Sequence, residues 1–383
     1  MIKTKHLYLV ITGMIFLFTQ CKKDISESIE SDFVKSKVEV VKGKRAFYYW
    51  KTLMQFDEAD KDIADNLNLA TMYVRYFDIS WSYTRGGIPV GVLNADKYDF
   101  DEASATFGAR NIIPTVFITN EVFKNIKEEE LKELAYKTSL KIEQISAELE
   151  NLYYETNKGK AGDKKIQFSF DDLIAEVQID CDWTASTRDK YFKFLKILDK
   201  EIEEPLSCTV RLHQYRDRKL MGIPPLDRGL LMCYNVADVQ RYDTKNAIID
   251  GSIVKQYVID TPYPIKLDIG LPLFSWAAWY RGQEFKGLVS GWNSKDAANT
   301  NLYKKSIANQ YVVSKDALLG NYYLREGDVL RWDNSNKAEI EKTIAILSDK
   351  IDLSASRIAF FDWETEKIKQ HENELETYYS SFE

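Results

Sequence analysis

The sequence has few of the residues that bind metals and no excess of positive charge. Its 383 residues include three histidines and four cysteines, which leaves few ligands for a zinc site built from these side chains. Acidic residues outnumber Lys and Arg by 59 to 52, so the formal net charge is −7. A nucleic-acid-binding protein would normally carry a basic surface. The composition therefore predicts no metal site and no nucleic-acid partner.

The motifs of several common enzyme sites are also absent. The chain contains no G-x-x-x-x-G-K-[ST], G-x-G-x-x-G, H-E-x-x-H or G-x-S-x-G sequence, which are the signatures of phosphate loops, dinucleotide folds, zinc proteases and serine hydrolases. The Gly86-Gly87 pair, followed by Pro89, has the composition of a turn. We therefore expect no bound cofactor.

An apolar run near the N-terminus has the form of a targeting signal. Lys3 and Lys5 precede the run, which extends from Leu7 to Phe18, and Cys21 follows it. The run is shorter than the roughly 20 residues that span a bilayer and is typical of a secretory signal. The cysteine at its end resembles the lipobox of bacterial lipoproteins. This resemblance implies a signal peptide over residues 1–20 and attachment of lipid, such as palmitate, at Cys21; an uncleaved signal anchor is the alternative.

The polar segment after Cys21 is expected to be a flexible tether over residues 21–44. It begins with Lys22-Lys23-Asp24, which resembles the surface-export signal of Bacteroidota lipoproteins and implies an outer-membrane protein, facing the periplasm or the cell surface. Three cysteines remain beyond the signal, at positions 181, 208 and 233. An odd number cannot all pair, and each lies in a strand-like run, so we expect buried free thiols.

Strand-like runs alternate with helical segments over the rest of the chain. Eight runs are rich in β-branched and aromatic residues: Arg45–Trp50, Thr71–Ile79, Asn111–Ile118, Ala175–Trp183, Ser207–Gln214, Gly229–Asn235, Ile265–Trp276 and Arg357–Trp363. Five segments have helical apolar spacing: Glu58–Leu67, Glu128–Tyr154, Arg188–Glu201, Ala247–Val258 and Lys337–Ile351. Alternation of this kind predicts a parallel sheet. Eight strands predict one TIM-type (β/α)8 barrel over residues 45–383, ending in a helix.

The segment between the seventh and eighth strands is longer than one helix requires. It contains the strand-like runs Phe285–Ser290 and Asn321–Trp332. We expect these runs to form hairpins over the C-terminal rim of the barrel, where such barrels place their sites.

The most informative run is Val177-Gln178-Ile179-Asp180-Cys181-Asp182-Trp183. Because side chains alternate along a strand, Asp180 and Asp182 share the inner face, roughly 6.6 Å apart, and Cys181 faces the helices. Acids on this face are costly unless they are hydrogen-bonded or functional. They either form a functional site or belong to a buried network with Arg75 and Arg211. His213, near Arg211, is a structural or a catalytic candidate.

This run resembles the fourth-strand motif of glycoside hydrolase family 18, the chitinase-like barrels, which reads D-x-x-D-x-D-x-E. Asp180 and Asp182 match its two later aspartates, whereas Val177 replaces the first aspartate and Thr184 replaces the glutamate that acts as general acid. Met232-Cys233-Tyr234-Asn235 resembles the family's sixth-strand Met-x-Tyr-Asp, with Asn235 in place of Asp. The resemblance covers roughly residues 45–365 and is at the level of the superfamily.

The resemblance implies a glycan ligand, and the aromatic content is in keeping with it. The chain has 8 Trp, 23 Tyr and 19 Phe, and aromatic rings at strand ends can stack on sugars. The resemblance implies catalytic roles for Asp180, Asp182 and Tyr234. The predicted substrate-binding residues are Trp183, Asn235, Trp276, Trp363, Arg75 and Arg211.

Two functions remain open on the sequence. In the first, an envelope lipoprotein hydrolyses β-linked sugars, and an acid from another strand, such as Asp78 or Glu364, replaces the missing glutamate. In the second, the barrel is degenerate and the lipoprotein binds glycans or assembles at the surface without catalysis. Thr184 and Asn235 favour the second; the retained aspartate pair favours the first. The oligomeric state stays undecided.

Overall fold

The computed structural model describes residues 42–96, 106, 110–157, 173–290 and 292–382. The predicted signal peptide, Cys21 and most of the predicted tether lie outside this range. Within it, no helix is both long enough and apolar enough to cross a membrane.

A closed barrel forms the body of the protein. Its sheet has nine strands, and β1 pairs with both β16 and β2, which closes the ring. Eight strands are parallel: β1 (Arg45–Tyr49), β2 (Thr71–Ser82), β4 (Asn111–Ile118), β5 (Val177–Asp180), β6 (Leu206–Arg211), β7 (Arg228–Met232), β8 (Lys266–Pro272) and β16 (Ile358–Phe361). The ninth, β3 (Gly86–Val90), pairs antiparallel with β2. The predicted TIM-type (β/α)8 fold is confirmed.

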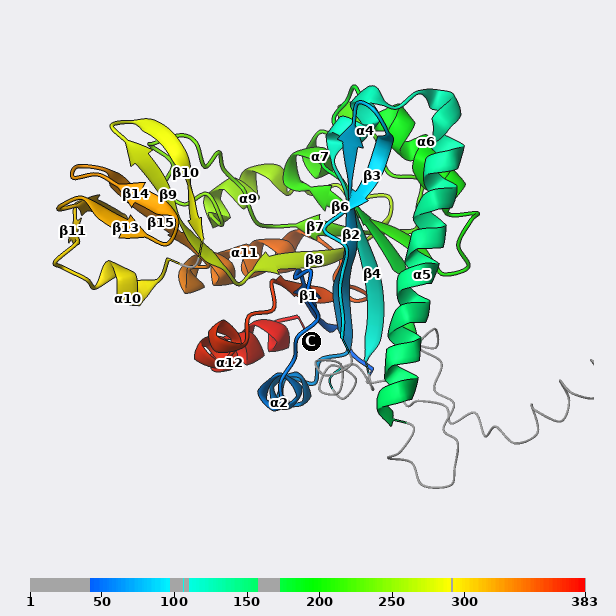
Figure 1. Cartoon of the computed structure of the whole chain (residues 1–383), viewed down its shortest axis with the longest axis horizontal. Helices are drawn as coiled ribbons and strands as arrows, with labels where there is room; N and C mark the ends of the chain where they lie inside the picture. The colour runs from blue at the N-terminus through cyan, green and yellow to red at the C-terminus, as the bar shows by residue number, and fades with distance from the viewer. Residues whose placement is uncertain (1–41, 97–105, 107–109, 158–172, 291, 383) are drawn as a thin grey trace, which may run out of the picture.

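Helices follow the strands and cover the outside of the barrel, as Figure 1 shows. They are α2 (Glu58–Asn66), α4 (Asn120–Asn125), the 3-10 turn η1 (Glu128–Glu130), α5 (Leu131–Asn157), α6 (Arg188–Leu198), α7 (Leu212–Arg216), α8 (Arg218–Met221), α9 (Gly251–Tyr257), α11 (Lys337–Lys350) and α12 (Thr365–Ser380). Side-chain caps mark the starts of some of these helices. Asp57, for example, caps α2 by accepting from the Asp60 backbone N–H, and Asp60 returns the contact.

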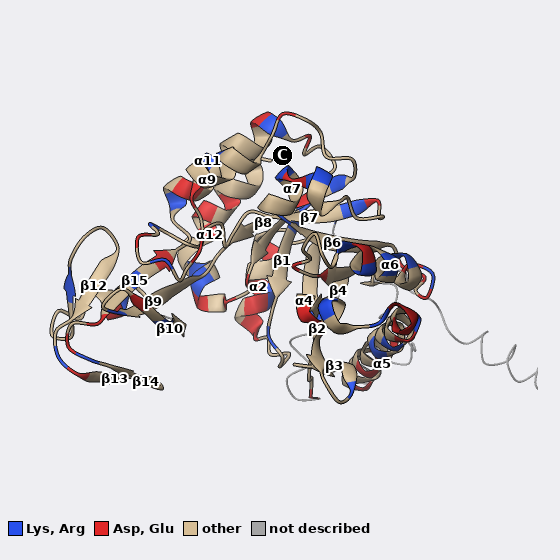
Figure 2. Ribbon diagram, turned by 90° about the horizontal axis from the view of Figure 1, so that it is seen from above, with Lys and Arg blue, Asp and Glu red and all other residues tan. Residues whose placement is uncertain are grey.

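The long segment after β8 forms an insertion beside the barrel. Its elements are β9 (Ser275–Arg281), β10 (Glu284–Ser290), α10 (Ser294–Ala297), β11 (Tyr303–Lys305), β12 (Gln310–Val313), β13 (Ala317–Leu319), β14 (Tyr322–Leu324) and β15 (Val329–Asn334). Five of the strands make an antiparallel sheet in the order β10-β9-β15-β12-β11. In Figures 1 and 2 this sheet stands to the left of the barrel, with β8 leading into it.

Alternation along the strands separates two apolar layers. Tyr48, Met232 and Tyr234 belong to a cluster inside the barrel, whereas Phe47 and Cys233 pack in the much larger layer between strands and helices. The three described cysteines are free and buried, as expected.

The fifth predicted strand is shorter than its sequence indicates. β6 stops at Arg211, and α7 begins at once, so His213 lies on a helix and is exposed. The cause is local, because the Gln214 side chain accepts from the Arg211 backbone N–H at 2.6 Å and donates to the Trp183 carbonyl at 2.9 Å.

Charged side chains close the N-terminal end of the barrel. Asp268 is 1% exposed and accepts from Arg228 at 2.6 Å, from Arg357 at 2.8 Å and from the Tyr73 hydroxyl at 3.1 Å. Arg357 also donates to Glu176 at 2.6 Å. Each buried charge therefore has a partner, as a low-dielectric interior requires. A ligand would have to enter from the opposite end.

Candidate functional site at the barrel mouth

The barrel mouth is the C-terminal end of the parallel strands, where (β/α)8 proteins carry their sites. Side chains from six neighbouring positions around the ring meet there: Trp50 after β1, Phe361 at the end of β16, Phe274 after β8, Tyr234 after β7, Arg211 at the end of β6 and Asp182 after β5. The first three are aromatic and the last two are charged. The mouth therefore has an apolar half and a charged half, with Tyr234 between them.

The charged half contains a two-point ion pair. Arg211 donates from Nε and Nη2 to the two carboxylate oxygens of Asp182, with the Nη2 contact at 2.8 Å. The Asp182 side chain is 45% exposed and that of Arg211 is 22% exposed. A bidentate pair fixes the plane of the carboxylate and leaves its outer lone pairs available. Asp182 is therefore a fixed acceptor at the surface of the mouth.

Asp180 lies beneath this pair and is almost closed from water. The Thr209 hydroxyl donates to its carboxylate at 2.6 Å. Burial raises the pKa of Asp180 to about 6, and the charge of Asp182 adds to this; the Thr209 hydrogen bond and the Arg211 charge oppose it. The predicted network of Asp180 and Asp182 thus forms with Arg211, and it changes its charge near pH 6.

Arg75 does not join that network. It pairs instead with Asp78 on the same strand, donating from Nε at 2.8 Å, and its guanidinium lies 5.5 Å from the Trp50 ring centroid. Arg75 therefore adjoins the aromatic half of the mouth. Asp78 is committed to this pair.

Tyr234 packs at the centre of the mouth. Its ring stacks on Phe361 with centroids 5.3 Å apart and meets Phe274 edge-on at 6.1 Å. Burial raises the pKa of its hydroxyl well above the ordinary value, so this group is neutral and can act as a hydrogen-bond donor. Gly270 makes room for it, because a Cβ there would lie 3.2 Å from the Tyr234 ring. Asn235, the next residue, is exposed in a left-handed conformation with φ 53°.

Four half-buried aromatic side chains form a continuous series along the apolar half. We call Trp50, Phe361, Phe274 and Trp276 the rim row. The centroid of Phe361 lies 5.5 Å from that of Trp50 and 5.8 Å from that of Phe274, and Phe274 lies 5.2 Å from Trp276. Each of these four residues is partly exposed to solvent. The sequence interpretation selected Trp276 alone from this row.

Two of the predicted sugar-stacking tryptophans are not at the mouth. Trp183 is fully buried, stacks on Tyr191 and donates from Nε1 to the Met221 carbonyl at 2.9 Å. Trp363 is 1% exposed and donates to Asp60 of helix α2 at 2.8 Å. Both belong to the layer between strands and helices, so neither offers a ring face to a ligand. The aromatic rings at the mouth are instead those of the rim row.

No glutamate takes the place of the motif's general acid. Thr184 stands there, with its hydroxyl 3.0 Å from that of Ser186. Glu364, one of the expected replacements, lies 3.7 Å from Lys51 in an open ion pair. Asp362, which the sequence interpretation missed, follows Phe361 and has a pKa raised by burial. Among the described residues, His, Cys, Asp and Glu form no group of three that could hold a metal ion.

Comparison with known proteins gives a likeness of fold. The chain matches no protein-family model and no curated protein. It is similar to the solved structure of the Bacillus cereus spore cortex-lytic enzyme SleL, at 14% identity over 88% of this chain and 75% of that one, with a TM-score of 0.43. The class V chitinase of Nicotiana tobaccum follows at 8% identity, 88% and 98% coverage and a TM-score of 0.45.

A GH18 chitinase of Cycas revoluta, solved with (GlcNAc)3, gives 11% identity, 89% and 99% coverage and a TM-score of 0.46. At these values the likeness concerns the path of the chain and transfers no residue roles. Chitinases are thus among the structures to which this barrel is similar in outline.

Proposed function

We propose that this protein binds a glycan at the barrel mouth. The rim row is the observation that carries the proposal. Sugars present both apolar C–H faces and hydroxyl groups. The mouth offers a matching pair of surfaces, with aromatic rings at the C-terminal ends of β1, β16 and β8 and fixed polar groups at those of β5 and β6. Ring faces and a few oriented polar groups are what small-ligand sites generally combine.

The polar half would orient the sugar. The Asp182 carboxylate, held by Arg211, can accept from sugar hydroxyls through its free lone pairs. Asn235 is exposed at the same edge and could supply an amide group. Asp180 would support Asp182 from below rather than touch the ligand, because it is only 8% exposed.

Binding is tested by titrating the purified protein with a panel of oligosaccharides that includes (GlcNAc)3 and (GlcNAc)4. Phe361→Ala should weaken binding about tenfold, the value of roughly 1.4 kcal/mol that one stacked aromatic contact can contribute. Trp363→Phe is the matched control, since Trp363 lies two residues away and faces the helices. It should leave the affinity unchanged. Equal effects of the two variants, or no binding of any glycan by the wild type, would refute the proposal.

Hydrolysis is the second candidate, and Asp180 favours it. A carboxyl whose pKa is raised to about 6 beside a second carboxyl group is the kind of arrangement that acid–base catalysis uses. In this version Asp182 would stabilise the reacting sugar. Asp362, which follows Phe361 at the end of β16 and has a pKa raised by burial, would be the candidate proton donor. The test is release of products from β-linked glycans by the wild type but not by Asp182→Asn. If the wild type binds a glycan but releases no product, hydrolysis is refuted and only the binding function is retained.

We further propose that the barrel is held at the cell envelope by lipid on Cys21. The support is the sequence of the first 24 residues: two lysines, an apolar run, a cysteine and a polar segment.

A further inference from the structure

Strand β15 carries an ion pair that is completely closed from water. Arg331 and Asp333 are both 0% exposed, and Arg331 donates from Nε and Nη2 to the two Asp333 oxygens, each at 2.9 Å. Removing two charges from water is costly, and an apolar pair of similar volume is often as stable. Stability alone therefore does not explain the pair, and its other contacts indicate what it does.

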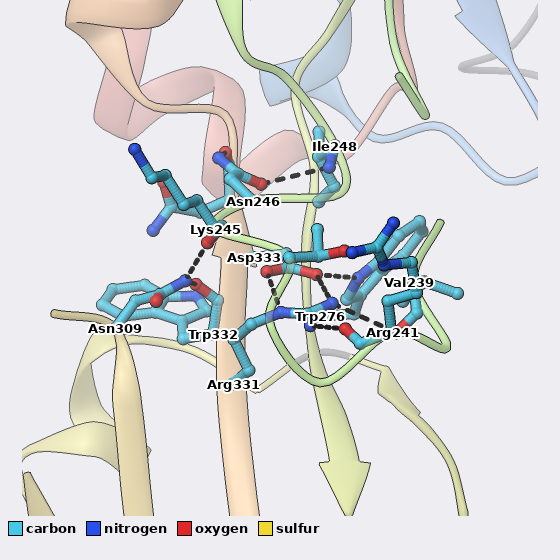
Figure 3. Close-up of polar contacts among 12 residues, drawn as sticks. Val239, Arg241, Lys245, Asn246, Ile248, Trp276, Asn309, Arg331, Trp332 and Asp333 are labelled. Carbon is cyan, nitrogen blue, oxygen red and sulfur yellow. Dashed lines mark hydrogen bonds and ion pairs between the residues drawn. The ribbon is translucent and has the colours of Figure 1, made fainter. Parts of the chain in front are cut away.

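Asp333 holds the outermost ring of the rim row. The Trp276 indole donates from Nε1 to Asp333 Oδ2 at 3.2 Å, across the register that pairs these two residues in β9 and β15. Figure 3 shows Trp276, Asp333 and Arg331 converging at this point. The indole has one N–H, and fixing it to a buried carboxylate restricts the rotation of the ring.

Arg331 holds the loop that leaves the barrel after Tyr234 and Asn235. Its guanidinium donates to the Arg241 carbonyl at 2.7 Å and to the Val239 carbonyl at 3.2 Å, as Figure 3 shows. The base of the same loop is closed by the Asn235 N–H, which donates to the Ile248 carbonyl at 2.8 Å. Two side-chain amides add to the attachment: Asn309 donates to the Lys245 carbonyl and Asn246 to that of Asn334.

These contacts connect the insertion to the mouth at two places. Through Asp333 they reach Trp276 and, by ring packing, Phe274 and the rest of the rim row. Through Arg331 they reach the loop that carries Asn235. The Arg331–Asp333 pair thus connects Trp276, in the aromatic half of the mouth, with the loop that carries Asn235.

We propose that Arg331 and Asp333 are positioning residues that set the Trp276 ring as an outer sugar-binding surface, one ring beyond Phe274. This inference rests on the glycan-binding function proposed above. A surface further out contacts an additional sugar unit, so the pair would affect longer oligosaccharides more than shorter ones.

The chain contains a matched control. Arg281 donates to both oxygens of Asp328 at 2.9 Å, and the Trp279 indole donates to Asp328 at 2.8 Å. The chemistry is that of the first set, and Asp328 is 2% exposed. However, Trp279 alternates to the other face of β9 and packs near Tyr322 of β14, away from the rim row.

The first measurement needs no ligand. Indole N–H signals of the ¹⁵N-labelled full chain are assigned with Trp276→Phe, and their exchange with water is followed. Asp333→Asn should accelerate exchange of the Trp276 N–H about tenfold or more, whereas Asp328→Asn should leave it unchanged. Arg331→Lys, which keeps the charge but not the fork, should give an intermediate rate. Unchanged exchange in D333N would overturn the positioning role.

The second measurement is titration with (GlcNAc)4 and (GlcNAc)3. D333N and W276F should each weaken binding of the tetramer about tenfold and that of the trimer less, while D328N binds as the wild type does. W276F keeps the buried pair intact, so its result stands if D333N unfolds. Equal losses in D333N and D328N, or equal losses for both oligomers, would overturn the inference alone. If the wild type binds neither oligomer, the proposed function fails for this probe and the sugar-binding part of the inference fails with it; indole exchange still decides the positioning part.

Discussion

Asp180 and Asp182 are two residues apart, yet only one of them is cut off from water. The Asp180 side chain lies inside the barrel under the Thr209 hydroxyl, and the Asp182 side chain reaches the mouth and is 45% exposed. Burial raises the pKa of Asp180 to about 6. The folded protein therefore retains a proton on Asp180 that the unfolded chain releases near pH 4.

We predict that Asp180→Asn changes how stability depends on pH. Because the folded-state pKa is the higher one, the folded protein binds more protons than the unfolded chain between about pH 4 and pH 6, and the wild type loses stability as pH rises through this window. A shift of about two units corresponds to at most about 3 kcal/mol. Urea unfolding of D180N from pH 4 to 7 should give a free energy that falls less with pH.

Parallel curves for D180N and the wild type would contradict this assignment. Thr209→Val provides a control in the other direction. It removes the hydrogen bond that favours the ionised carboxylate, so the loss of stability should extend to higher pH than in the wild type.

The prediction for Trp183 was wrong because it ignored the alternation of side chains along the strand. Alternation would have placed Trp183 on the outer face. The alternation that puts Asp180 and Asp182 inside the barrel also puts Trp183 on the side of Cys181, which faces the helices. The expectation for Trp183 depended on its place at a strand end alone. Trp363 is different, because it has the parity of the inward residue Phe361. β16 ends at Phe361, and the Trp363 N–H then donates to the Tyr48 carbonyl, so alternation no longer applies.

At the scale of elements, the strands were predictable because each carries its own pattern. All eight barrel strands coincide with apolar, β-rich runs, and β4 has the predicted bounds of Asn111–Ile118. The errors lie at strand ends. The run from Ser207 predicted a strand through Gln214, but the Gln214 side chain binds the Arg211 backbone and starts α7. A contact between side chain and backbone of this kind is decided by three-dimensional packing as well as by local propensity.

The insertion was predictable in place but not in form. Two strand-like runs between the seventh and eighth strands indicated hairpins. β10 coincides closely with the first run, whereas the second run, Asn321–Trp332, contains β14 and only the first part of β15. The sheet order β10-β9-β15-β12-β11 depends on pairing between β9 and β15, which lie far apart in the sequence. No local pattern specifies such a pairing. The Arg331–Asp333 pair was missed for the same reason, since the partners it holds come from β9 and the β7–α9 loop.

At the scale of the whole molecule, the two ends of the barrel differ in chemistry. The N-terminal end is closed by Asp268 with Arg228 and Arg357, and the charges there are paired and largely buried. The C-terminal end presents half-buried rings and the part-exposed Asp182–Arg211 pair. The first end is built for stability, and the second is the end at which we propose that a glycan binds; this is the usual division in (β/α)8 barrels.

This division predicts opposite phenotypes for two similar substitutions. Asp268→Asn removes a buried charge that neutralises two arginines and should lower the free energy of unfolding by about 3 kcal/mol, with little effect on glycan affinity at a temperature where the protein is folded. Asp182→Asn affects a part-exposed carboxylate and should lower stability by at most about 1 kcal/mol while weakening binding. Denaturant unfolding and oligosaccharide titration of both variants test this. Similar effects of the two on either quantity would show that the ends are not functionally distinct.

The proposed lipid anchor makes a prediction about the full chain. If Cys21 carries lipid, the wild type expressed with its first 20 residues in a bacterial host should partition into detergent, and Cys21→Ser should move it to the aqueous phase, because a lipid chain contributes about 0.8 kcal/mol for each buried CH2 group. Cys233→Ser is the matched control, since Cys233 is buried and free in the barrel and its loss should not alter partitioning. Wild-type protein that stays in the aqueous phase would exclude the lipid anchor. Detergent partitioning of Cys21→Ser would also count against it and would point instead to an uncleaved signal segment in the membrane.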